Sequence, residues 1–191
     1  ATHTTRQKEI YDIVIASHEA SIKELRPGVT FESVYDTSAK VIVEGLKSLG
    51  FMRGDAAEAV KAGAHALFYP HGLGHMMGLD VHDMENLGEI YVGHNGQPKS
   101  TQFGRKSLRL GRMLEPGFVH TIEPGIYFIP ELIDLWRSER KFEEFINYEK
   151  VVTYKDFGGI RNEADYLITP TGSRLLGKQL PRTTEEIEAL R

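Results

Sequence analysis

The hydrophobic period changes once along this chain, near residue 62, and that change limits the fold more than any other feature. Before it, apolar residues recur at helical spacing over 5–25 and over 30–50, with Thr30 as an expected N-cap, and a shorter helix is expected over 55–62. Beyond it, glycine is frequent and short apolar runs predict strands near 66–70, 118–123, 126–129, 148–154 and 160–169. Helices that precede a run of strands predict an α+β domain with helices covering one face of a largely antiparallel sheet.

The remaining segments predict smaller helical pieces around this core. The charged stretch 131–150 predicts an exposed helical flap, and Thr183 with Glu186 has the form of a capping box that starts a last helix. A chain of 191 residues is expected to bury roughly 70% of its unfolded surface, which is enough for one core. We therefore expect a single domain over residues 1–191.

Composition excludes several classes of partner. The chain carries 27 acidic and 23 basic side chains, a net charge of -4, and it has no long lysine or arginine run, which argues against nucleic acid. It has no cysteine, so any metal must be held by nitrogen and oxygen ligands, and a reducing, cytoplasmic location is favoured. No apolar stretch approaches the roughly 20 residues of a membrane span, which predicts a soluble chain without a membrane partner.

The run HGLGHMMGLDVHD at 71–83 concentrates the candidate ligands. His71 and His75 are four residues apart, but the glycines among them disfavour a helix, so an extended backbone is predicted. Positions separated by an even number share one face of a strand, so both imidazoles can point into one cavity. The alternative is a pair of hydrogen-bonded core histidines.

Two glutamates stand at the ends of predicted strands. Glu123 precedes Pro124, where strand pairing must stop, so its carboxylate is expected to face a cleft. Glu163 follows Arg161 by two residues, and the alternative for this pair is a surface ion pair worth at most about 1 kcal/mol. One histidine and two glutamates from separate strands form the nitrogen and oxygen set expected of a hydrolytic metal site.

These motifs resemble those of the pita-bread metallopeptidases, the family of methionine aminopeptidase, aminopeptidase P and prolidase. The similarity covers essentially the whole chain and is strongest to the prolidase type, in SLRLGRMLEPGFVHTIEPGIYFIPELID at 107–134, FGGIRNEADYLIT at 157–169 and PRTTEEIEAL at 181–190. The resemblance implies a pita-bread (creatinase/aminopeptidase-like) catalytic domain. It also implies hydrolysis of Xaa-Pro peptide bonds, of the Xaa-Pro dipeptidase type.

The resemblance assigns roles to five residues of the cluster. His75, Glu123 and Glu163 match metal ligands, with Glu163 expected to bridge two divalent ions, Mn2+ first and Co2+ or Zn2+ as alternatives, and a hydroxide between the ions as nucleophile. Glu123 is the expected proton shuttle to the leaving nitrogen. His82 resembles the histidine that hydrogen-bonds the scissile carbonyl, and His71 resembles one that lines the substrate pocket.

Two arginines are implied to act beside these ligands. Arg161 is expected to orient the metal-binding carboxylates. Arg109 matches the arginine that reads the free carboxylate of a dipeptide, which a guanidinium can bind with two parallel hydrogen bonds. Arg105 and Arg112 are close alternatives for that role.

The chain departs from the family pattern at its start. The family places two further aspartate ligands in a hairpin before the first long helix, whereas Asp12 and Asp36 lie inside helical patterns. We therefore expect a domain incomplete at its N-terminus, without that hairpin or the family's N-terminal domain, whether by design, proteolysis or gene truncation. Such a chain is expected to hold at most one ion weakly, to be inactive alone, and to self-associate through an unpaired sheet edge. Asn162 also stands where prolidases usually carry an apolar residue.

Two other functions stay open from the sequence. The first is aminopeptidase P activity on longer Xaa-Pro peptides, and the second is a non-catalytic module that binds a peptide or a protein partner. For the whole protein, the resemblance implies a proline-containing dipeptide or short peptide as substrate and a homodimer as the assembly.

Overall fold

The first third of the chain is helical, as expected. The computed structural model describes residues 2–190. Helices α1 (Thr5–Glu24), α2 (Phe31–Ser48) and α3 (Ala56–Ala62) come first. The Thr30 side chain accepts a hydrogen bond from the Ser33 backbone N–H, which confirms the predicted N-cap. The later helices are α4 (Glu89–His94), α5 (Pro130–Ser138), α6 (Tyr148–Val151) and α7 (Thr184–Glu188), the last one closed by the predicted capping box.

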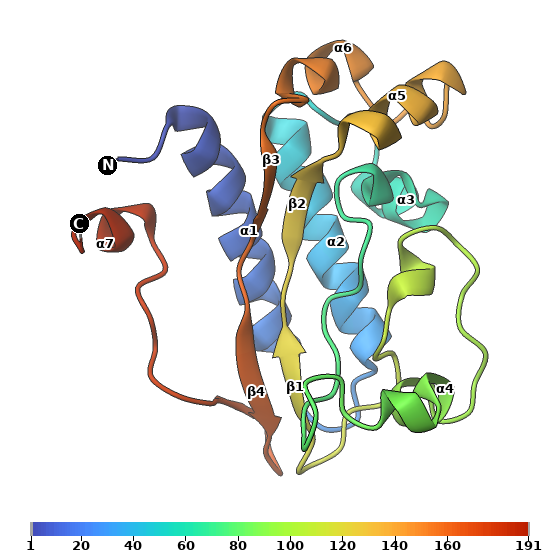
Figure 1. Cartoon of the computed structure of the whole chain (residues 1–191), viewed down its shortest axis with the longest axis vertical. Helices are drawn as coiled ribbons and strands as arrows, with labels where there is room; N and C mark the ends of the chain where they lie inside the picture. Colours follow the sequence, from blue (N-terminus) through green and yellow to red (C-terminus); the bar gives the residue numbers. More distant parts are fainter. Residues whose placement is uncertain (1, 191) are drawn as a thin grey trace.

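The strands form two short antiparallel ladders that continue one into the other. They are β1 (Val119–Ile122), β2 (Gly125–Phe128), β3 (Gly158–Arg161), β4 (Ala164–Ile168) and β5 (Ser173–Leu175). One ladder has the order β1-β4-β5 and the other pairs β2 with β3, all antiparallel. Figure 1 shows α1 and α2 running side by side along these strands. This arrangement confirms the α+β prediction, with helices on a largely antiparallel sheet.

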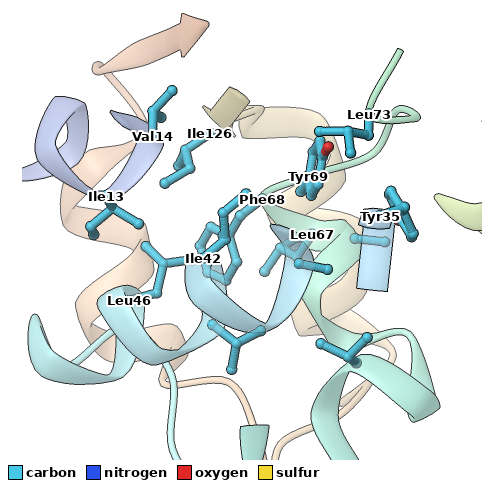
Figure 2. Close-up of a cluster of buried hydrophobic side chains, with 14 of the residues drawn as sticks. Ile13, Val14, Tyr35, Ile42, Leu46, Leu67, Phe68, Tyr69, Leu73 and Ile126 are labelled. Carbon is cyan, nitrogen blue, oxygen red and sulfur yellow. The ribbon is translucent and has the colours of Figure 1, made fainter. Parts of the chain in front are cut away.

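The core lies between the long helices and the strands (Figure 2). Ile13 and Val14 from α1, Ile42 and Leu46 from α2, and Ile126 from β2 are almost completely buried there. These positions recur at the spacing that places side chains on one face of a helix. The packed layer holds the strands, and so the residues at their ends, in fixed positions.

Two predicted strands were wrong for the same reason. The segment 66–70 begins inside a 3-10 helix (Ala64–Leu67) and continues as irregular buried chain, because a short apolar run alone does not separate a strand from a buried helical turn. The segment 148–154 forms α6 and a 3-10 turn. There Tyr148, Val151 and Tyr154 are buried at intervals of three residues, which is a helical period.

The charged stretch 131–150 is not merely a solvated flap. Ile133 and Trp136 of α5 are buried, and Ile146 forms an isolated antiparallel bridge with Met52. The apolar side chains among its charges anchor this stretch against the core. Among the described residues, no helix is both long and apolar enough to span a bilayer.

Candidate metal centre

The two glutamates lie where one ladder ends and the next begins. Ile122 pairs with Ala164 at the end of the first ladder, and Gly125 pairs with Arg161 at the start of the second. Between these pairs the chain provides 123–124 on one side and 162–163 on the other. Pro124 has no N–H to donate, so the regular pairing stops at this point. Glu123 and Glu163 are therefore delivered to one place by strands that the sheet already holds together.

The histidine segment runs beside β1 without forming a regular strand. The Thr121 backbone N–H donates to the His75 carbonyl at 3.0 Å, and the Glu123 N–H donates to the Leu73 carbonyl at 2.8 Å. A Cβ atom on Gly74 would lie 2.2 Å from the carbonyl oxygen of Thr121, so only glycine permits this approach. The predicted extended backbone is hydrogen-bonded to β1 as expected, but the one bridge here, Met76 with His120, is isolated.

Three donor groups meet at this point. One ligand atom from each of His75, Glu123 and Glu163 lies within 4.8 Å of the other two. The His75 Nδ1 lies 3.0 Å from the Met76 carbonyl, and because a carbonyl only accepts, Nδ1 carries the hydrogen. This leaves the lone pair of Nε2 directed toward Glu123 Oε1, 3.4 Å away. His75 and Glu123 are 5% and 8% exposed, whereas Glu163 is exposed.

The Glu123 carboxylate is held from two sides. The Thr121 hydroxyl donates to Oε1 at 3.0 Å, and Arg161 Nη1 donates to Oε2 at 2.7 Å. Arg161 Nε also donates to the Tyr127 hydroxyl at 2.8 Å. The surface pair between Arg161 and Glu163, considered from the sequence, is replaced by this bond to Glu123. Arg161 thus contacts a candidate ligand, as the orienting role requires.

Glu163 stands in an electrostatic environment that a cation would relieve. Desolvation of its carboxyl group raises the pKa of Glu163, and the adjacent Glu123 carboxylate raises it further. Two carboxylates beside an imidazole nitrogen match the oxygen and nitrogen donors that divalent cations such as Mn2+ and Zn2+ accept. The donor set among the described residues therefore fits a divalent metal.

His71 and His82 line a cleft of about 270 Å³ together with His75 and Glu123. The His71 ring lies edge-on to Tyr69 and Tyr127, with centroid distances of 4.9 and 5.3 Å. Its Nδ1 bonds the Gly72 carbonyl at 2.7 Å, and its buried Nε2 has no partner among the described residues. Burial lowers the pKa of His71, so the ring is held neutral. The exposed His82 ring stands perpendicular to that of His75 at 4.3 Å.

Of the three candidate arginines, Arg105, Arg109 and Arg112, it is Arg109 that reaches this cleft. It lines the cavity and donates through Nη1 to Glu85. Arg105 instead bonds Glu32 and Asp36 of α2, and Arg112 bonds Glu115. The position of Arg109 favours it over both alternatives as a reader of a substrate carboxylate.

Sequence reasoning missed Thr121, Tyr127 and Glu85. Thr121 had a detectable signal, because it lies two residues before Glu123 and so shares its face of the strand. Tyr127 and Glu85 had none, because their contacts depend on the way that distant segments fold together.

Comparisons with known proteins identify the family of this chain. The model of metallopeptidase family M24 matches residues 1–170. The Xaa-Pro dipeptidase of Homo sapiens is 38% identical over 186 residues, covering 97% of this chain and 36% of that protein. Two structures of Escherichia coli aminopeptidase P, one zinc-substituted with product and one with the inhibitor Pro-Leu, are each 37% identical with a TM-score of 0.72, and cover 99% of this chain and 35% of theirs. The chain therefore spans about a third of the length of these relatives.

Proposed function

The chain belongs to metallopeptidase family M24 and has its pita-bread catalytic fold, and on that basis we propose that it forms the catalytic part of an enzyme that hydrolyses Xaa-Pro peptide bonds. The observation that carries the proposal is the meeting of His75, Glu123 and Glu163 at a cleft that Arg109 also lines. The Xaa-Pro dipeptidase type is the first candidate. The relatives' names, Xaa-Pro dipeptidase and aminopeptidase P, support this substrate class.

His75, Glu123 and Glu163 are the residues that hold divalent metal in this proposal, two ions in the whole protein with Mn2+ as the first choice. Bound divalent ions acidify water and stabilise the negative charge that develops on the scissile carbonyl oxygen. Arg161 and Thr121 fix both oxygens of Glu123, so the carboxylate keeps one orientation during turnover. Glu123 is also the group that passes a proton toward the leaving nitrogen.

The remaining cleft residues bind the substrate. Arg109 pairs with the free carboxylate of a dipeptide, and this restricts activity to short substrates. His82 is exposed beside His75 and donates a hydrogen bond to the scissile carbonyl. The neutral His71, held between two tyrosine rings, supplies an uncharged wall with one free ring nitrogen, suited to the apolar proline side.

The decisive experiment is Arg109→Ala in the intact protein, assayed with Mn2+ on Gly-Pro and on a longer Xaa-Pro peptide. We expect kcat/KM for Gly-Pro to fall by about tenfold or more while the longer peptide is little affected, since a bidentate charge-assisted pair contributes about 1.5–3 kcal/mol. Arg112→Ala is the matched control, because Arg112 bonds Glu115 instead of lining the cleft. No cleavage of either peptide by the wild type would refute the enzyme proposal.

Two alternatives have distinct outcomes in the same assay. If Arg109→Ala leaves kcat/KM unchanged for both substrates, and the wild type prefers the longer peptide, the aminopeptidase P type replaces the dipeptidase type. If wild-type protein binds a proline peptide without cleaving it, a non-catalytic binding module is the better description. The presence of all three metal donors favours catalysis over that module. The homodimer, the cytoplasmic location and the inactivity of the chain in isolation stay predictions.

A further inference from the structure

We propose that Thr121 is a positioning residue whose hydroxyl fixes Glu123 and His75 relative to each other before metal binds. The inference rests on the proposed metallopeptidase function, and it concerns a residue that is neither among the cleft-lining residues nor in the candidate donor set. Thr121 lies in β1, two residues before Glu123, and is 1% exposed. Its side chain therefore points to the same side of the strand as that of Glu123.

The Thr121 hydroxyl joins the two candidate ligands directly. Its Oγ1 accepts the backbone N–H of His75 at 3.0 Å and donates to Glu123 Oε1 at 3.0 Å. The Thr121 backbone N–H donates back to the His75 carbonyl, also at 3.0 Å. His75 is thus bonded twice to Thr121, and Glu123 once, so the three residues form one hydrogen-bonded unit.

The number of hydrogens in this unit determines which atom donates in each bond. A hydroxyl has one hydrogen, and because the His75 N–H already donates to Oγ1, that hydrogen is free for Glu123. Arg161 donates to the second carboxylate oxygen at 2.7 Å. Each oxygen of Glu123 therefore accepts one hydrogen bond in this arrangement. Oε1 keeps a lone pair that the Thr121 hydroxyl does not use, and this oxygen lies 3.4 Å from His75 Nε2.

Burial makes the hydroxyl difficult to replace. Thr121, His75 and Glu123 are each less than 10% exposed, so bulk water cannot supply the missing bonds if the hydroxyl is removed. Without it, the His75 N–H loses its acceptor and Glu123 Oε1 loses its donor. Both ligands then gain freedom together, which lowers metal affinity even though neither ligand is changed.

The test compares Thr121→Val, which keeps the branched shape and removes the hydroxyl, with Thr121→Ser, which keeps the hydroxyl. Mn2+ affinity of the intact protein is measured by isothermal titration calorimetry and by electron paramagnetic resonance of free Mn2+. We expect Thr121→Val to weaken binding at least tenfold, the range seen for partners of metal ligands, and Thr121→Ser to stay within about threefold of wild type. With saturating Mn2+, kcat on Gly-Pro should fall while KM stays unchanged.

Equal Mn2+ affinity in Val, Ser and wild-type protein would overturn the inference. Equal loss in Val and Ser would also overturn it, because the lost property would then be side-chain volume. Circular dichroism checks folding, and if the Val variant does not fold, Thr121→Ala takes its place against Ser with the same two expectations. Failure of the proposed function can be distinguished from failure of this inference. If the wild type binds Mn2+ but cleaves no Xaa-Pro peptide, the effect of the Thr121 variants on Mn2+ affinity still tests the positioning role.

Discussion

The inner wall and the outer rim of the cleft are built in opposite ways. The inner wall, formed by His75, Thr121 and Glu123, is buried and joined by main-chain and side-chain hydrogen bonds to β1. The outer rim, which includes His82 and Arg109, is more exposed, and the one side-chain bond recorded for these two joins Arg109 to Glu85. The fold thus fixes His75 and Glu123, two of the three candidate ligands, whereas the side chains of the outer rim are held by fewer contacts.

This difference separates two properties of the proposed enzyme. Metal affinity should depend on the packing and pairing of the inner wall, because its groups have lost their freedom during folding. Substrate choice should depend on the rim, where exposed ion pairs change at small energetic cost. Variants of the two regions should therefore affect different measurements.

The largest effect is expected from Glu123→Gln on the inner wall. The amide of glutamine has only one oxygen, so it cannot accept the hydrogen bonds of both Thr121 and Arg161. Metal binding and proton transfer by this side chain should therefore both be weakened. We expect kcat/KM on Gly-Pro to fall about 10³-fold, with Mn2+ affinity reduced in parallel. Glu149→Gln is the control, because the Glu149 side chain is 86% exposed. Retention of a tenth of the activity would show that the inner wall does not carry the chemistry.

Acid should destabilise the fold through two buried histidines outside the inner wall. Burial lowers the pKa of both His18 and His65 to about 4, below the ordinary 6.5. Because the folded state resists their protonation, their stabilisation is present above pH 6.5 and is lost as the pH falls toward 4, by up to about 3 kcal/mol each.

Melting temperatures between pH 7.5 and 4.5, in steps of half a unit, check this expectation. His65→Gln can retain a bond to the Tyr35 hydroxyl, which lies 2.8 Å from His65 Nε2, and should remove only the part of the pH dependence that His65 contributes. A melting temperature independent of pH below 6.5 would contradict the assignment.

A smaller loss is expected from Gly74→Ala, which tests whether the histidine segment must lie against β1. The new methyl group would meet the Thr121 carbonyl, so the two backbones must separate, at a cost of about 1–3 kcal/mol in unfolding free energy. Urea denaturation measures that loss, and Mn2+ affinity should fall with it. Gly172→Ala is the matched control, since a Cβ there meets nothing within 4 Å. Equal stability of both variants would mean that the segment has room to move.

The smallest effect is expected on the rim, from Glu85→Gln. Neutralising Glu85 frees the guanidinium of Arg109 for the substrate carboxylate, so KM for Gly-Pro should fall by about fivefold or less with kcat unchanged. Steady-state kinetics at constant ionic strength give both parameters. Glu115→Gln, which releases Arg112 instead, should change neither. A fall in kcat for the Glu85 variant would mean that a rim residue affects the chemical step, and it would contradict the separation between the rim and the inner wall.

The sequence predicted the parts of this molecule that depend on local pattern. The long helices, the Thr30 cap and the final capping box follow from spacing and residue type, and the structure confirms them. The meeting of His75, Glu123 and Glu163 also agrees with expectation, although the choice of His75 among the histidines came from the family resemblance and not from the local pattern. Their roles in binding and catalysis stay predictions that the experiments above address.

The sequence did not predict contacts that join distant segments. The family resemblance implied that Arg161 orients the metal-binding carboxylates without saying which one, and Arg161 bonds Glu123, 38 residues away, although Glu163 is its near neighbour in the chain. Glu85 bonds Arg109 across a stretch that includes α4 and a 3-10 turn. The residue types of 148–154 predict a strand, because tyrosine and valine favour strands, but Tyr148, Val151 and Tyr154 are buried at helical intervals and the segment forms a helical turn. Such outcomes are decided by tertiary packing instead of local preference.

The break between the two ladders has a consequence for folding fidelity. Two residues separate the paired positions on each side, so both glutamates arrive together only when Ile122 lies opposite Ala164 and Gly125 lies opposite Arg161. A slip of one residue would turn Glu163 to the opposite face of the sheet. Affinity for a divalent cation is therefore a measure of correct alignment, and a cation present during refolding would enrich the correctly aligned chain by mass action.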